Sequence, residues 1–234
     1  MNKYFIFFAL ALLSSCIKDS DPIVTGLERA YLSGNGVFIM NEGNFRSGNG
    51  SLSFFSYDSM KIYNNIFREA NDRPLGDVPY SIGLYNNTAF ILVNNSDKVE
   101  VANLKDMKSV TTIEKIVSPR YISFINSQKA YVTSLYSDSI RIIDLHSKTA
   151  TGYIPLENTS ESIVTASSRA YAANWTGGSK IFVINTLTDE VTDSIDVGIE
   201  PESMVVDRNN TLWVLCNGGW KRENYAELVA VNTS

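Results

Sequence analysis

The sequence predicts an all-β protein, a β-propeller of four-stranded blades that repeat about every 41 residues. Short segments rich in β-branched and aromatic residues alternate with turn residues, and helical periodicity is nearly absent. Residues 181–215 contain one full set of four strands. We expect those strands at residues 181–185, 191–197, 203–207 and from 212, separated by turns at 186–190, 198–201 and 208–210.

Three landmarks of this unit recur along the chain in register. An apolar residue near the start of the first strand recurs at spacings of 40, 41 and 41, as Ile82, Ile122, Ile163 and Met204. The second strand begins at Ala89, Ala130, Ala170 and Leu212, and the third at Val99, Ile140, Ile181 and Leu228. A partial copy precedes them at 37–39, 52–54 and 61–63. Four strands per repeat of about 40 residues are typical of a propeller blade.

The first residues have the pattern of an export signal. Lys3 precedes an apolar stretch at residues 4–13 that is too short to span a bilayer. Leu13-Ser14-Ser15-Cys16 then resembles the bacterial lipobox, which implies a signal peptide at 1–15 and a lipidated Cys16. The alternative is an ordinary signal peptide that leaves Cys16 as a free thiol. We expect a tether at 16–35 and the propeller at 36–234.

Composition argues against several classes of function. A formal net charge of −5 gives no basic surface for nucleic acid. The single histidine, His146, is expected in a surface turn, and no nucleophile elbow accompanies it. We expect Cys216 to be a buried, unreactive thiol. No metal-ligand cluster is present in the sequence. We therefore predict that the protein is not an enzyme and that it uses neither a metal nor a cofactor.

Candidate ligand-binding residues lie in the loops that leave the second strand of each repeat. These loops converge at one end of a propeller channel, and their amides and aromatic rings suit an uncharged or amphipathic ligand. Asparagine also favours turns by itself, so both interpretations stay open for each Asn. Arg120, with Tyr80, Glu161 and Glu202, stands just before a first strand and is expected near the channel mouth. The candidates are Asn41, Glu42, Asn44, Phe45, Asn94, Arg120, Tyr136, Asn174, Trp175, Asn217 and Trp220.

The repeats also resemble a known family. Residues 130–134 and 183–206 are similar to the YVTN-type repeat of YncE-like propellers, a likeness that extends from Gly36 to the end. Residues 41–45 and 48–54 resemble the opening blade of surface lipoprotein propellers of Bacteroides-type bacteria, a group that includes the cobalamin-capturing BtuG proteins. A run of Lys and acidic residues at 18–21 resembles the surface-export signal of such lipoproteins.

The resemblance implies a binding protein anchored by lipid in the outer membrane and facing the cell surface. It would capture a corrinoid or another nutrient for a TonB-dependent transporter. The alternatives are a structural or protein-interaction propeller, or a hydrolase or lyase of surface glycans that uses Glu161 and Glu202 as paired carboxylates.

The resemblance also implies a blade number, because such propellers usually close with seven. About 200 residues at this period make five blades, and the last repeat stops after its third strand. We therefore expect a seven-bladed propeller that is truncated in this sequence, and not a five-bladed ring. An open arc would leave an unpaired sheet edge, which natural proteins avoid.

Overall fold

The computed structural model describes residue 32 and residues 34–221 and 224–233. The predictions for residues 1–31, including the signal peptide and the lipidation of Cys16, lie outside this part of the chain. Within it, the predicted fold class is confirmed. Five antiparallel sheets follow one another along the sequence and are arranged as the blades of a β-propeller.

Each blade is formed by consecutive strands that pair in chain order. Blade 1 consists of β1 (Gly36–Asn41), β2 (Ser51–Ser56) and β3 (Lys61–Tyr63). Blade 2 consists of β4 (Pro79–Tyr85), β5 (Thr88–Val93), β6 (Lys98–Asn103) and β7 (Ser109–Glu114). Blade 3 consists of β8 (Pro119–Phe124), β9 (Lys129–Ser134), β10 (Ser139–Asp144) and β11 (Thr149–Pro155).

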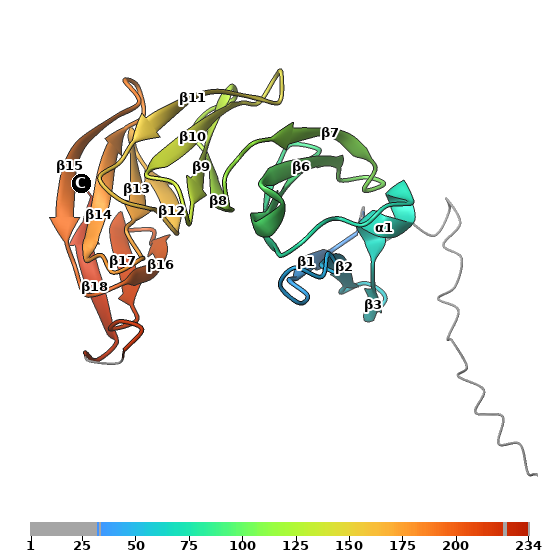
Figure 1. The fold of residues 1–234 in the computed structure, drawn as a ribbon, viewed down its shortest axis with the longest axis horizontal. Helices are drawn as coiled ribbons and strands as arrows, with labels where there is room; N and C mark the ends of the chain where they lie inside the picture. Colours follow the sequence, from blue (N-terminus) through green and yellow to red (C-terminus); the bar gives the residue numbers. More distant parts are fainter. Residues whose placement is uncertain (1–31, 33, 222–223, 234) are drawn as a thin grey trace, which may run out of the picture.

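Blade 4 consists of β12 (Ile163–Ala166), β13 (Arg169–Ala173), β14 (Lys180–Asn185) and β15 (Glu190–Asp196). Blade 5 consists of β16 (Pro201–Val206), β17 (Thr211–Cys216) and β18 (Glu227–Asn232). The strands predicted between residues 181 and 215 are therefore confirmed, with small shifts at their ends. Figure 1 shows the blades as an arc that is open between blade 1 and blade 5.

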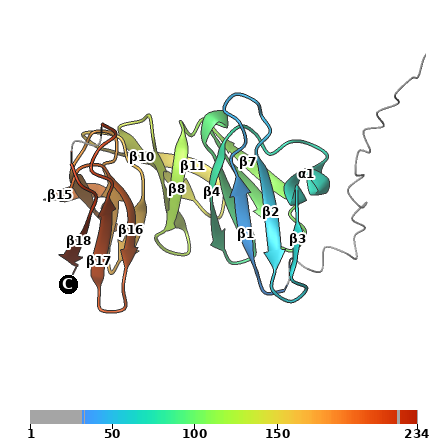
Figure 2. The ribbon, with the colours of Figure 1, turned by 90° about the horizontal axis from the view of Figure 1, so that it is seen from below.

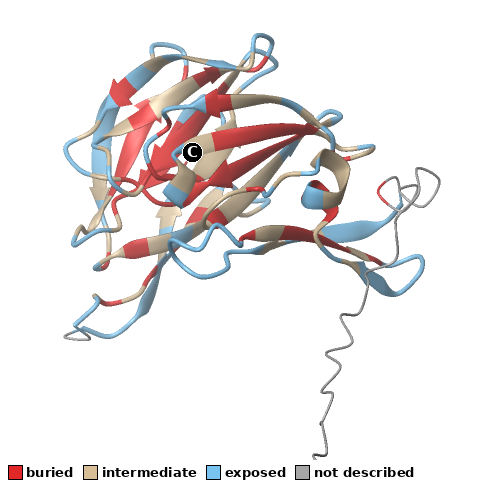
Figure 3. Ribbon diagram, turned by 45° about the vertical axis from the view of Figure 1, so that its right-hand side comes forward, coloured by how far each residue is buried: buried red, intermediate tan, exposed pale blue. Residues whose placement is uncertain are grey.

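The inner strands β4, β8, β12 and β16 line the concave side of the arc, and each contacts the next. The core lies between the blades, because both faces of a central strand are covered. In β5, Ile91 and Val93 pack toward Leu52 of blade 1. Phe90 and Leu92, on the other face, pack toward blade 3. Figure 3 shows these buried strand centres between exposed loops. Such strands read as continuous apolar runs because neither face meets water.

Two local features were not predicted. A short helix, α1 (Ile66–Asn71), fills the connection between blades 1 and 2 and buries Ile66 and Phe67. Six residues are too few to show a helical period in the sequence. Leu32 is buried against the same cluster, so the last part of the expected tether contacts blade 1. No helix in the described residues is long and apolar enough to cross a membrane.

Candidate functional site

Two sets of loops meet at one end of the propeller, which we call the loop face. They are the connections that leave the second strands and those that enter the inner strands (Figure 2). Backbone hydrogen bonds join the two sets, as from Asn94 N to Val78 O (2.8 Å), Leu135 N to Ser118 O (3.1 Å) and Asn217 N to Glu200 O (3.1 Å). The described residues of the second-strand loops are 42–50, 94–97, 135–138, 174–179, 217–221 and 224–226.

Large aromatic side chains stand exposed on three of these loops. The exposed fraction is 64% for Phe45, 75% for Tyr136 and 89% for Trp220. Tyr225, which the sequence analysis did not single out, is 96% exposed on the loop of Trp220. Trp220 borders a hollow of 290 Å³ whose wall includes Ile199. Aromatic rings exposed in this way are typical of binding surfaces, because they offer large apolar area with few rotamers.

The candidate asparagines divide into buried and exposed ones. Asn94 and Asn174 are buried and connect neighbouring loops. Asn94 Nδ2 donates to Ser118 Oγ (2.8 Å), and Asn174 Nδ2 donates to Thr159 O (3.0 Å). These two side chains therefore connect the loops to one another, and their Nδ2 donors are engaged within the protein and not turned toward a ligand.

The other asparagines and the remaining first-loop candidates are exposed or half-buried on the loop face. Asn41 Nδ2 donates to Ser51 Oγ and Ser53 Oγ, which steadies the end of β1. Asn217 Oδ1 accepts from Gly219 N (2.8 Å), a bond that shapes the Trp220 loop. Three further candidates share an exposed position in the first loop: Glu42, Asn44 and Phe45.

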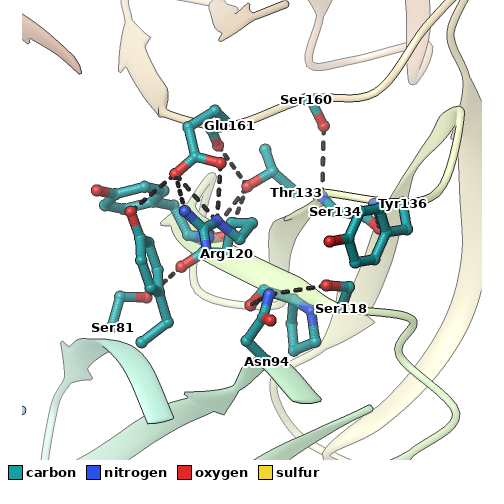
Figure 4. A network of polar contacts seen from close by, with 12 residues as sticks. Ser81, Asn94, Ser118, Arg120, Thr133, Ser134, Tyr136, Ser160 and Glu161 are labelled. Carbon is teal, nitrogen blue, oxygen red and sulfur yellow. Dashed lines mark hydrogen bonds and ion pairs between the residues drawn. The ribbon is translucent and has the colours of Figure 1, made fainter. Parts of the chain in front are cut away.

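Arg120 forms a buried ion pair at the inner edge of the loop face (Figure 4). Its Nε lies 2.8 Å from Glu161 Oε2, and its Nη2 donates to Glu161 Oε1 at 2.8 Å. The side chain of Glu161 is only 1% exposed. Thr133 Oγ1 donates to the backbone oxygen of Glu161 (2.6 Å) and so fixes its position. Two-point pairing of this kind sets both distance and orientation.

Aromatic rings complete this cluster from two blades. Tyr80 donates to Glu161 Oε1 (2.9 Å), and the Arg120 guanidinium carbon lies 3.3 Å from the centre of the Tyr80 ring. Burial and the nearby charge of Glu161 raise the pKa of the Tyr80 hydroxyl, which is therefore protonated and able to donate. The Trp175 ring centre lies 6.0 Å from the same guanidinium carbon, and Trp175 Nε1 is buried without a hydrogen-bond partner among the described residues.

The predicted candidates thus fall into three groups. The first is the set of exposed residues on the outer loops, which includes the aromatic rings. The second is the set of asparagines that bind neighbouring loop atoms. The third is Arg120 and Trp175, which lie in or beside the Tyr80–Arg120–Glu161 cluster of blades 2, 3 and 4. Cys216, which we expected to be buried, is buried, and burial raises the pKa of its thiol. A raised thiol pKa disfavours the thiolate form that nucleophilic catalysis needs.

Together, the blades and the loop face define a β-propeller protein. The DUF5074 family, described as a domain of unknown function, matches residues 35–233, and the chain belongs to this family. No curated protein sequence matches the chain.

Solved propellers show the same fold at low sequence identity. A quinoprotein alcohol dehydrogenase-like protein from Bacteroides thetaiotaomicron is 13% identical, with a TM-score of 0.61 over 86% of this chain and 52% of that one. Hydrazine synthase from Kuenenia stuttgartiensis is 19% identical, with a TM-score of 0.60 over 65% of this chain and 46% of that one. The chain therefore spans about half the length of these relatives. At such identities the likeness concerns the fold alone.

Proposed function

We propose that this protein is a binding protein that captures a nutrient at the loop face and passes it to a TonB-dependent outer-membrane transporter. A lipid on Cys16 would anchor it in the outer membrane with the propeller toward the cell surface. Among nutrients, the opening-blade resemblance favours a corrinoid. Capture would proceed by many loop contacts, without chemical change of the ligand.

The observation that carries this proposal is the set of exposed aromatic rings on equivalent loops. Phe45, Tyr136 and Trp220 come from blades 1, 3 and 5 and share one face of the molecule. Full burial of a large apolar side chain contributes a free energy of about 1.5–3 kcal/mol, and these exposed rings lack most of that contribution. A ligand with a broad apolar surface and polar edges would recover that burial and would meet asparagine amides around it.

Titration of the protein with cyanocobalamin tests the proposal. We expect saturable binding, and replacement of Trp220 by alanine should weaken it at least tenfold, because truncation of an aromatic anchor costs about 2 kcal/mol or more. The indole N–H signals of the tryptophans, followed by NMR during the titration, locate the binding. Those of Trp175 and Trp220 should shift. The signal of Trp213 is the control and should stay unchanged, because its Nε1 donates to Asp207 Oδ2 (3.1 Å) at the opposite end of β17.

Two other outcomes would favour the alternative functions. If calorimetry detects no binding of cyanocobalamin by the folded protein, but the protein co-purifies with a transporter, the corrinoid is ruled out and the protein-interaction function is favoured. The hydrolase alternative requires turnover of a surface glycan that is lost in the Glu161→Gln, Glu202→Gln double variant.

Lipid attachment gives a separate prediction. The protein should partition with outer membranes and carry a mass increment of acyl chains, and the Cys16→Ser variant should lose both. Lipid that persists in Cys16→Ser would contradict the anchor, whereas a soluble wild-type protein would favour the ordinary signal peptide.

A further inference from the structure

The third strands of blades 2, 3 and 4 carry three chemically different residues at one position of the repeat. They are Glu100, Arg141 and Phe182, which follow one another at a spacing of 41 residues. In blade 2, the Glu100 carboxylate accepts hydrogen bonds from several neighbouring side chains. In blade 4, Phe182 is buried in an apolar cluster with residues of blade 3. Both residues are thus satisfied by the protein itself, and Arg141 is the exception.

Arg141 has no hydrogen bond or ion pair with any residue that the structure describes. Its side chain is half-buried, and its Nε is buried. A guanidinium keeps its charge in proteins and can only donate hydrogen bonds. A buried donor or charge that lacks a partner costs free energy, and an anion bound beside it would recover that cost.

The neighbours of Arg141 supply no counter-charge. The strand register places Val132 of β9 and Tyr153 of β11 directly opposite Arg141, so the three side chains share one face of blade 3. Val132 packs against blade 2, and Arg141 therefore faces blade 2 as well. The residues of blade 2 that form this cluster are apolar: Phe90, Leu92, Val99, Val101 and Ile113.

Tyr153 gives this place a second binding group. Its side chain is 62% exposed, and directly opposite residues of an antiparallel pair have Cβ atoms about 5 Å apart. β10 and β11 are the outer strands of blade 3, on the convex side of the arc (Figure 1). Blades 2 and 3 each have four strands and a blade on either side, so both walls around Arg141 are complete.

We propose that Arg141 binds an oxyanion at the outer side of the junction between blades 2 and 3. The planar guanidinium fork matches the two oxygens of a carboxylate or of a phosphate group. The Tyr153 ring then flanks the group that carries the oxyanion. This inference goes beyond the proposed function, because Arg141 lies on an outer strand and the proposed nutrient contacts lie on the loop face.

Titration of the ¹⁵N-labelled protein with benzoate, inorganic phosphate and benzamide, at constant ionic strength, tests the inference. The side-chain Nε–H signal of Arg141 and the backbone amide signal of Tyr153 are followed. We expect saturable shifts with benzoate, phosphate or both, and none with neutral benzamide. Binding of benzoate alone assigns a carboxylate, binding of phosphate alone assigns a tetrahedral oxyanion, and binding of both assigns a site for either.

Two variants of Arg141 separate the guanidinium fork from the charge. Arg141→Gln should bind the oxyanion about tenfold or more weaker, because hydrogen bonds to a charged group are lost. Arg141→Lys keeps the charge but not the two-point geometry, and it should also bind more weakly than wild type. Its backbone signals at residues 141 and 153 report the binding.

A control variant separates a local contact from overall charge. Arg169→Gln removes the same charge from an exposed position at the start of β13 and should leave oxyanion binding unchanged. Three results would overturn the inference: no saturable shift with either oxyanion, equal affinity in wild type and Arg141→Gln, or equal binding of benzamide and benzoate.

Discussion

Replacement of Glu161 by alanine should lower the free energy of unfolding by about 3–5 kcal/mol, the usual cost of removing one partner of a buried ion pair. Arg120 would keep its charge, because a guanidinium does not lose its proton in proteins. Its side chain is 11% exposed, so water could solvate it only partly. Tyr80 would lose its acceptor as well. The lost contacts would destabilise three blades, since the cluster joins blades 2, 3 and 4.

Urea denaturation of single and double variants measures this effect. The double variant Arg120→Met, Glu161→Leu should recover most of the lost stability, because well-packed apolar residues often replace a buried ion pair at little cost. Glu202→Ala is the matched control, since it removes a carboxylate from the equivalent position of blade 5, where no described residue pairs with it, and it should change stability by less than about 0.5 kcal/mol. Equal losses in Glu161→Ala and Glu202→Ala would show that the cluster contributes no net stability.

The blades could be predicted because the repeat keeps three landmarks in register. The expected strand at 181–185 is β14 (Lys180–Asn185), and the expected strand at 203–207 is β16 (Pro201–Val206). Turn residues marked the ends of these strands, and β-branched residues marked their centres. Residues 66–71 escaped prediction because their helix depends on tertiary burial of Ile66 and Phe67, which no local period reveals.

The site was less predictable than the fold, although the repeat length does predict the pairing of Tyr80, Arg120 and Glu161. Arg120 and Glu161 are 41 residues apart, and Tyr80 and Glu161 are 81 apart, which are one and two repeat lengths. Residues at equal positions of successive blades meet around the channel, so the pairing follows from the period. The loop asparagines carry no such information. Asn94 is buried and Asn41 is exposed, and only packing between loops separates them.

A second buried carboxylate, Glu100 in β6, should make the stability depend on acid. Its side chain is 0% exposed and accepts from Arg73 Nη2 (2.8 Å), Ser109 Oγ (2.5 Å) and Lys98 Nζ (3.2 Å). Burial alone would raise the pKa of Glu100, but the hydrogen bonds from Arg73 and Ser109 and the positive charge of Lys98 together hold it below its ordinary value. The folded state therefore binds this proton less readily than the unfolded chain.

It follows that the contribution of Glu100 is fully present above the ordinary glutamate pKa, about 4.3, and is lost as the pH falls through the lower folded value. At pH 7, Glu100→Gln should cost about 2–4 kcal/mol, because Lys98 and Arg73 lose their counter-charge. Urea denaturation from pH 7 to pH 3 should show this difference shrinking with acid. Glu114→Gln removes an exposed charge at the end of β7 and should run parallel to wild type. If Glu100→Gln also runs parallel to wild type down to pH 3, Glu100 is not held as a carboxylate by its neighbours. A narrowing gap would show that the folded protein holds Glu100 as a carboxylate, partly through Arg73 from the connection between blades 1 and 2.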